Sequence, residues 1–388
     1  MPKQYTNGRP QNVGTNGGGG LPNESGSIII DYIQEQPETI QDGLLALFSA
    51  DVDSFFMGDK IYIDQLGADQ EVAKAKTPSA KADIIEPKGI LDFEVEAPKY
   101  SLKIPFNIRA GKDVRLAGQA PTDDIDKQAI LGVMLKNRVL VMINRTKRAM
   151  MKQAAQIFQT GKIAFSKEDA GLADADFKYS PELFYDYTTK WVNADGTINQ
   201  NTDPIKDIRD RISLIYDKSS VSEFDVLLDG TAYDGLLKNE KVLKFADTQW
   251  IEILRFAPKE MQADGRAYCG THFIDGRKVD FYLFNGTYRE NGVSKKYLND
   301  GQVVILPKNG GKYKVCFAGV DMVSELDESL KEVSPTRNIT LFGDRKAVDV
   351  WIETIKEDNT AFLQFTSRPV LCAVSRDTHG SFNVKAKA

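Results

Sequence analysis

The residue types that most often carry acid–base, nucleophilic or metal chemistry are scarce in this chain of 388 residues. There are two histidines, His272 and His379, and three cysteines, Cys269, Cys316 and Cys372. A histidine-based general base or catalytic triad therefore has almost no material. Cys269 and His272 lie three positions apart, but a structural zinc needs four ligands and no second closely spaced pair is near. We interpret the pair as part of a turn, and we predict no catalytic residue, no cofactor and no metal ion.

Two further groups invite a phosphate-binding interpretation. The glycines at 17–20 lack both the Gly-Lys-Ser/Thr sequence and the preceding strand of a phosphate-binding loop. Arg145, Lys147, Arg148 and Lys152 lie within one predicted helix and could face DNA. A run of this kind is more often the solvent-exposed face of a helix, and we favour that interpretation.

The net charge and the spacing of the cysteines argue against several classes of protein. The formal net charge of −5 argues against nucleic acid as the main partner, because phosphate binding needs a basic face, although incidental DNA contact is not forbidden. The cysteines show no paired spacing, which predicts reduced thiols in a protein that folds in the cytosol. No apolar run resembles a signal peptide or reaches the ~20 residues of a membrane span, so we expect no membrane partner.

The first third of the sequence predicts an arm and a flap that extend from the main body of the subunit. Residues 1–26 are rich in Gly, Asn and Pro and cannot offset their ordering entropy by burial, which predicts a mobile arm. Residues 60–64 have the composition of a strand. Residues 65–118 contain two predicted strands, 90–97 and 100–108, with the alternation of a strand that has one polar face. A two-stranded flap is marginal by itself, so we expect it to be stabilised only by lying on a neighbouring copy.

The pattern changes to a helix at residues 122–160. Apolar residues recur with the helical period, Asp123 and Asp124 suit the positive N-terminal end, and Gly161 is placed to end the helix. At ~1.5 Å per residue the helix would be roughly 55–60 Å long, which predicts a spine against which other elements pack.

Shorter elements follow the spine. The spacing of apolar residues predicts a helix at 203–218, a strand at 224–228 and a helix from Thr231. Strand patterns recur from 277 to 317, from 361 to 365 and from 370 to 374. Together these elements predict an α+β fold with a long helix on sheet, preceded by an arm and a flap.

One stretch, from Asn285 to Leu306, resembles a signature of the lambda-type major capsid protein family (phage major capsid protein E). The family pattern is an aromatic residue, a Gly turn, Tyr-Leu-Pro-Asp-Gly and a Val-rich strand. The sequence departs from it at Asn299, where Pro is usual, and Asn keeps the turn chemistry. The positions that match the signature are Tyr288, Gly292, Tyr297, Leu298, Asp300 and Gly301.

Other stretches resemble the family in the same order. Lys60–Asp64 is similar to the strand before the flap, and Ala97–Lys103 to a Pro-aromatic-basic element within it. Phe158–Lys162 resembles the exit of the spine helix, and Thr366–Leu371 the terminal Ser-x-Pro-Leu strand. Together the matches cover most of residues 60–375.

The resemblance implies the Hong Kong 97-type phage capsid fold, with an N-terminal arm, an extended hairpin called the E-loop, a peripheral P-domain containing the spine helix and a central A-domain. The implied division is 1–64 for the arm and lead-in strand, 65–118 for the E-loop, 119–200 for the P-domain with the spine at 122–160, 201–349 for the A-domain, and 350–388 for the return to the P-domain.

The implied function is that of the major capsid protein of a tailed double-stranded DNA phage, and not an enzyme. Its copies would form hexamers and pentamers that close into an icosahedral head. The implied partners are further copies, scaffold, portal and decoration proteins, and packaged DNA without sequence specificity. The implied location is the virion, with assembly in the host cytoplasm.

The E-loop is expected to make the contacts between subunits, with its apolar side chains buried on the neighbour. The residues expected in these contacts are Ile90, Phe93, Val95, Pro98, Lys99, Tyr100, Leu102, Ile104 and Phe106.

Three alternatives rank below this one. A bacterial nanocompartment shell would share the fold, and adjacent terminase and portal genes or a DNA-filled particle would discriminate. A tail or decoration protein would lack the flap and the long helix that follows it. An enzyme would need a cleft with perturbed titratable groups.

Overall fold

The computed structural model describes residues 43–49, 56, 58, 60–65, 91–107, 126–165, 172–248, 265–308, 313–319, 348–355 and 360–387. The predicted arm, most of the predicted E-loop including Ile90, and residues 122–125 lie outside this range. The helices are η1 (Gly43–Leu47), α2 (Asp126–Thr160), η4 (Pro181–Phe184), α3 (Pro204–Ser219), α4 (Gly230–Leu237) and α5 (Glu240–Thr248). None of them is long and apolar enough to cross a membrane.

Helix α2 is the predicted spine. It is 35 residues long, which corresponds to about 52 Å. Met142, Met150 and Ile157 recur on its buried side. The helix ends at Gly161, whose φ of +68° is the left-handed conformation that glycine adopts without strain, and whose N–H donates to the Ile157 carbonyl at 2.7 Å. The predicted spine and its glycine exit are confirmed.

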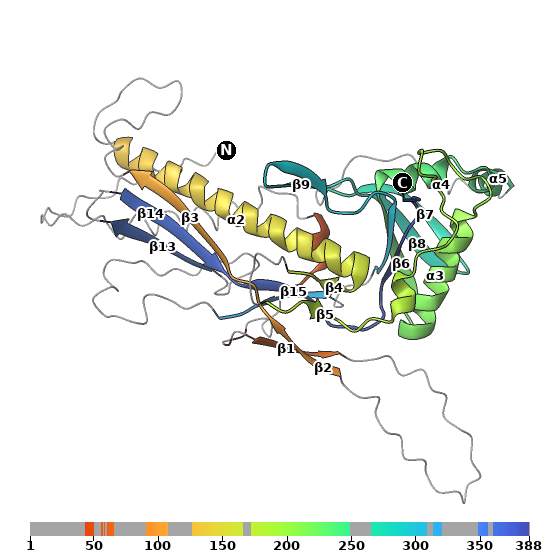
Figure 1. Cartoon of the computed structure of the whole chain (residues 1–388), viewed down its shortest axis with the longest axis horizontal. Coiled ribbons are helices and arrows are strands. Elements are labelled where there is room, and N and C mark those ends of the chain that lie inside the picture. Colours follow the sequence, from red (N-terminus) through yellow and green to blue (C-terminus); the bar gives the residue numbers. More distant parts are fainter. Residues whose placement is uncertain are drawn as a thin grey trace, which may run out of the picture.

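A three-stranded antiparallel sheet lies along the first half of α2 (Figure 1). Its order is β13 (Val348–Ile355), β14 (Thr360–Ser367) and β3 (Tyr100–Asn107). Arg138 of α2 donates to the carbonyl of Pro105 at 3.2 Å, which joins the helix to the edge strand.

This sheet corrects the predicted flap. The sequence predicted that residues 90–97 and 100–108 form one two-stranded flap without a place in the subunit, and this is wrong for β3. Strand β3 pairs along its whole length with β14 of the same chain, with Ser101 opposite Thr366, 265 positions away. Its half-buried residues Leu102 and Ile104 alternate with exposed ones and pack against the core. The local alternation gave the strand correctly but could not name its partner.

The hairpin partner of β2 (Leu91–Glu96) is β1 (Lys60–Gln65). Ile61 faces Val95 in the register, and both are buried, as is Ile63. Tyr62, on the other face, is 65% exposed. In Figure 1 the hairpin lies at the lower edge of the molecule, away from α2.

A five-stranded sheet forms the second main body. Its order is β16 (Gly380–Asn383), β11 (Gln302–Pro307), β6 (Glu223–Leu228), β8 (Arg277–Leu283) and β7 (Ala267–Ile274), with only β6 and β8 parallel. Helices α3, α4 and α5 lie around it (Figure 1). The predicted helix 203–218, strand 224–228 and helix from Thr231 are confirmed by α3, β6 and α4.

Small sheets complete the fold. They pair β4 (Lys162–Ile163) with β5 (Ala175–Asp176), β9 (Thr287–Glu290) with β10 (Val293–Lys296), and β12 (Tyr313–Phe317) with β15 (Pro369–Ala373). The predicted strands 361–365 and 370–374 correspond to β14 and β15. Strand β16 was not predicted; it adds to the five-stranded sheet although its residues fall in the range assigned to the P-domain.

A buried histidine joins the end of the spine to the C-terminal strands. His379 is fully buried, with Nε2 at 3.0 Å from the Ile157 carbonyl oxygen and Nδ1 at 2.9 Å from the Tyr313 hydroxyl. Because a carbonyl only accepts, Nε2 carries the hydrogen and the Tyr313 hydroxyl donates to Nδ1. The rings of Tyr179 and Phe158 pack on it at 4.3 and 5.7 Å. Burial favours the neutral imidazole, in which Nδ1 is the acceptor.

Burial lowers the pKa of His379 to about 4 from its usual 6.5. The unfolded chain therefore binds one proton more than the folded chain between these values, and His379 should contribute stability that is complete above about pH 6.5 and is lost as the pH falls toward 4. The loss should approach about 3 kcal/mol. Urea unfolding between pH 7.5 and 4 should show this slope, and His379→Gln should reduce it by one proton. Identical slopes in the two proteins would contradict the assignment.

Candidate functional site

The signature begins with a tight hairpin. Strands β9 and β10 pair with Glu290 opposite Val293, so Asn291 and Gly292 form a two-residue turn. Their φ angles are +50° and +80°, and nothing lies within 4 Å of a Cβ placed on Gly292. Glycine is therefore required at this position by backbone conformation and not by crowding.

The signature is anchored to the end of the spine helix. Tyr297 and Leu298 are buried, and the ring of Tyr288 lies 4.9 Å from that of Tyr297. The Gln159 side chain of α2 donates to the Tyr297 carbonyl at 3.0 Å, and the N–H of Asn299 donates back to Gln159 Oε1 at 3.0 Å. The departure at Asn299 thus has a physical consequence, because the Pro that is usual in the family has no N–H to donate.

A buried carboxylate organises the rest of the signature. Asp229, fully buried at the end of β6, accepts hydrogen bonds through Oδ2 from the N–H groups of Thr231 and Gly301, both at 3.0 Å. Its Oδ1 lies 3.1 Å from Nζ of Lys296. Its own N–H donates to the Gln302 carbonyl at 3.0 Å. One side chain therefore caps helix α4 and fixes the turn that leads into β11.

The last two signature residues hold the segment after β16. Gly301 has a φ of +75°, and a Cβ at this position would lie 2.5 Å from Cβ of Lys385. Asp300 pairs with Lys296 at 2.7 Å and with Lys385 at 3.6 Å, and its hydrogen bond from Lys296 lowers its pKa. All six signature positions thus lie in one connected structure, whose partners Asp229, Gln159 and Lys385 were not singled out from the sequence.

The residues predicted for contacts between subunits are divided between two elements. Val95 is buried in the β1–β2 hairpin and Pro98 is buried just after it. Phe93 stands opposite Ile63 in the register, and Phe106 stands opposite Ala361 in the β3–β14 pair. The side chains of Phe93 and Phe106 and all of Ile90 lie outside the description.

The remaining predicted residues follow Pro98. Lys99 is exposed and Tyr100 is half-buried, with its hydroxyl 2.8 Å from the amide nitrogen of Gln153 on α2. Leu102 and Ile104 are half-buried against their own subunit's core. Their contacts with a neighbouring copy stay a prediction. Because Leu102 and Ile104 are partly buried within the subunit, less of their apolar surface is available for such a contact.

The outer face of the β1–β2 hairpin is polar and acidic. Lys60 and Glu94 form an exposed ion pair at 2.7 Å, and the hydrogen bond from Lys60 to Glu94 raises the pKa of the lysine. Glu96 is also exposed. Tyr62 is the large hydrophobic side chain on this face, so it is the candidate for an anchor between copies.

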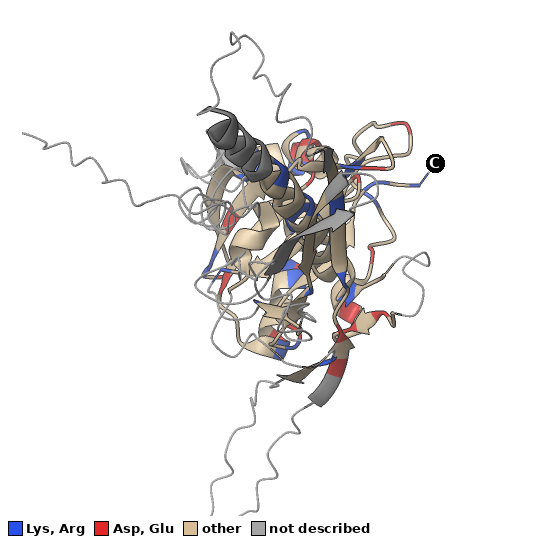
Figure 2. Ribbon diagram, turned by 90° about the vertical axis from the view of Figure 1, so that its left-hand side faces the viewer, with Lys and Arg blue, Asp and Glu red and all other residues tan. Residues whose placement is uncertain are grey.

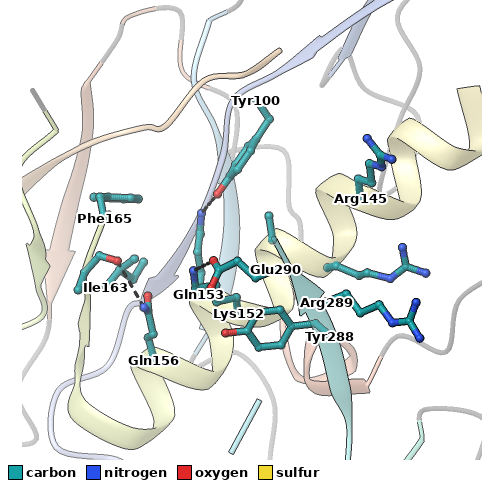
Figure 3. A pocket seen from close by; sticks show the side chains of 13 residues that line it. Tyr100, Arg145, Lys152, Gln153, Gln156, Ile163, Phe165, Tyr288, Arg289 and Glu290 are labelled. Carbon is teal, nitrogen blue, oxygen red and sulfur yellow. Dashed lines mark hydrogen bonds and ion pairs between the residues drawn. The ribbon is translucent and has the colours of Figure 1, made fainter. Parts of the chain in front are cut away.

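A basic groove lies between α2 and strand β9, with a cavity of about 520 Å³. Lys152 and Lys295 bind Glu290 from both sides, at 2.6 and 2.5 Å. Their hydrogen bonds lower the pKa of Glu290 to about 2. Figure 3 shows Arg145 and Arg289 on the same side of this cavity, beyond the Lys152–Glu290 pair. The sequence prediction of a solvent-exposed basic face is confirmed for Arg145 and Arg148 but is wrong for Lys147, which is buried.

The cysteine and histidine flagged in the sequence do not form a metal centre with their described neighbours. Cys269 and His272 both lie in strand β7 and are buried, so their interpretation as part of a turn is wrong. Burial raises the pKa of the Cys269 thiol to about 11 and lowers the pKa of His272. Within the described ranges no group of three or more His, Cys, Asp or Glu side chains could hold a metal ion.

Comparisons with known proteins identify the same family as the signature segment. The family model of the phage major capsid protein E matches residues 27–326, which is most of the chain. No curated protein matches it in sequence. The crystal structure of a candidate capsid protein of a prophage of Escherichia coli CFT073 is similar with a TM-score of 0.56 and 12% identity, over 95% of this chain and 100% of that one.

More distant structural similarity extends to other shells. The capsid of a native GTA particle has a TM-score of 0.43 and 11% identity, over 97% of this chain and 95% of that one. The SrpI encapsulin of Synechococcus elongatus PCC 7942 has a TM-score of 0.41 and 10% identity, over 88% and 86%. These values are too low to carry an argument.

The prophage protein shows the fold, and the family model shows the class of protein. The predicted α+β phage capsid fold is therefore confirmed. With the signature turn formed and anchored in the structure, the chain belongs to the phage major capsid protein E family and is a phage capsid protein.

Proposed function

We propose that the chain is the major capsid protein of a tailed double-stranded DNA phage and assembles as hexamers and pentamers into the icosahedral head that encloses the genome. The family match supports this class of function. In such a shell the functional site is a surface repeated on every copy. Copies that meet head-to-tail make a heterologous contact, which closes into a ring only at the right rotation.

The parts of the fold suggest a division of labour. Helix α2 and the sheet β13–β14–β3 would form the peripheral domain, and the five-stranded sheet with α3, α4 and α5 would form the axial domain (Figure 1). The E-loop would consist of β1, β2 and the residues between them. Compared with the division expected from the sequence, β3 moves into the peripheral domain and β16 moves into the axial sheet.

The observation that carries the proposal is the two-faced β1–β2 hairpin. Ile61, Ile63 and Val95 bury one face within the subunit, which fixes the base of the hairpin. Tyr62 is 65% exposed on the opposite face, and no described element covers it. Tyrosine supplies a large contact area with a polar end at a low cost in side-chain entropy. We therefore assign the contact with the next copy to the Tyr62 face.

The other proposed partners follow from assembly. Scaffold and portal proteins would act while the shell forms in the host cytoplasm, and decoration proteins would bind the finished shell in the virion. Packaged DNA would be contacted without sequence specificity. Nothing in this function requires a cofactor or a catalytic residue.

Expression of the chain, alone or with a neighbouring scaffold gene, should give closed particles of uniform size in electron microscopy. Uniform closure is expected because the same contact, repeated in the five-fold and six-fold rings, joins every copy to its neighbours. Particles that package DNA would support the phage head, whereas particles that enclose an enzyme would favour the nanocompartment alternative. Unassembled subunits under both conditions would contradict the proposal.

Tyr62→Ala should weaken assembly without unfolding the subunit. Truncation of an interface tyrosine should cost about 1.5 kcal/mol per contact and so raise the critical concentration for shell formation about tenfold. Tyr185→Ala is the matched control, since Tyr185 is 60% exposed but lies outside the hairpin. Sedimentation of shells over a concentration series measures the threshold, and equal thresholds in both variants would exclude Tyr62 from the contact.

A further inference from the structure

The groove between α2 and β9 carries an excess of positive charge that the described residues of the subunit do not neutralise. Its walls bring four cations to one cavity of about 520 Å³. The only carboxylate among the lining residues is that of Glu290, which two lysines already bind. The four cations are those of Arg145, Arg148, Lys152 and Arg289.

Three arginines hold the unneutralised charge. Arg145, Arg148 and Arg289 form no ion pair within the described part of the chain, although the chain as a whole carries a net charge of −5. Elsewhere exposed cations commonly have a carboxylate partner, as Lys238 has Asp234 at 2.9 Å. A cluster of unpaired guanidinium groups repels itself, and a bound anion relieves that repulsion. Among the described residues, the charge of these arginines is therefore complementary to an anionic ligand.

The groove and the acidic hairpin lie on different sides of the subunit. The β1–β2 hairpin carries the exposed carboxylates Glu94 and Glu96, but it leaves the molecule on the side opposite to α2 and β9 (Figure 1). In Figure 2 the basic segments lie in the middle of the view and the acidic segments of the lower hairpin lie below them. The exposed carboxylates of the hairpin therefore lie away from the groove of their own subunit.

We propose that the groove binds the phosphate backbone of double-stranded DNA, and that the α2 side of the subunit faces the enclosed genome. Planar guanidinium groups bind phosphate oxygens in pairs, so arginine fits this ligand better than a scattered lysine surface does. Arg145 and Lys152 are seven residues apart on one helix, about 10.5 Å along its axis. Successive phosphates of one DNA strand are spaced ~3.4 Å along the duplex axis, so the row spans about three phosphates.

This inference rests on the proposed function as a shell around DNA, but it can fail while that function stands. The test uses the full-length chain kept unassembled at low concentration and a fluorescent 20-base-pair duplex of arbitrary sequence. Anisotropy gives the binding constant over a series of salt concentrations. Arg145→Gln/Arg148→Gln is compared with Lys238→Gln/Lys244→Gln, which removes the same charge from exposed positions just after α4 and on α5.

The arginine double variant should bind the duplex roughly 10- to 100-fold more weakly at about 0.1 M salt, and the slope of log affinity against log salt should shrink by about 2, because two phosphate contacts are lost. The lysine control should change neither quantity by more than about twofold. Shell formation by both variants, followed in parallel by microscopy, keeps a failure of DNA binding distinct from a failure of assembly.

Three results would overturn the inference. Equal weakening in both double variants would show that only overall charge matters. A chain that does not bind the duplex at low salt would exclude the site. Tighter binding of polyglutamate than of the duplex would identify an acidic protein segment as the occupant. Arg289→Gln on β9 supplies a second measurement outside the helix, so a folding defect in the double variant does not leave the question open.

Discussion

The need to satisfy one buried carboxylate determines how the signature segment is held. Asp229 has no solvent contact, and an unpaired charge in such a place would cost several kcal/mol. Its hydrogen-bond donors come from three points at which the chain changes direction: the start of α4, the end of β10 and the turn before β11. Any other course of the chain at these points would leave the charge without donors. A short polar network therefore fixes the position of strands that are far apart in sequence.

A second group of hydrogen bonds joins the signature segment to the end of the spine helix α2. Gln159 binds the signature on both sides of Leu298, and one turn earlier Ile157 offers its carbonyl to His379. The end of α2 thus contacts both the signature and the loop before β16. The long helix and the elements that carry the signature and His379 meet at this point through directional hydrogen bonds. This arrangement favours a fixed angle between the two parts, which a shell built from many copies requires.

The elements whose signal is local were predictable from the sequence. The period of α2 and the helix from Thr231 each depend on neighbouring residues, and each was predicted correctly, while the turn at Gly292 was implied by the family resemblance. The partner of β3 was not predictable, because its alternation fits equally well a flap on another copy or an edge of its own sheet. Asp229 was also missed as a site residue, since a short polar residue before glycine is ordinary turn chemistry until the fold brings its donors together.

The distance along the chain between β3 and β14 has a consequence for synthesis. Ser101 leaves the ribosome 265 residues before Thr366, an interval on the order of ten seconds to a minute at ~5–20 residues per second. During this interval the partner strand β14 has not yet been synthesised. The backbone N–H and C=O groups of β3 are then available to pair with strands of other nascent chains. Lys103 and Pro105 are exposed on this strand. The charge of the lysine and the absence of a backbone N–H at the proline both disfavour pairing with a strand of another chain. Lys103 and Pro105 therefore disfavour aggregation through β3 while the chain is still being synthesised.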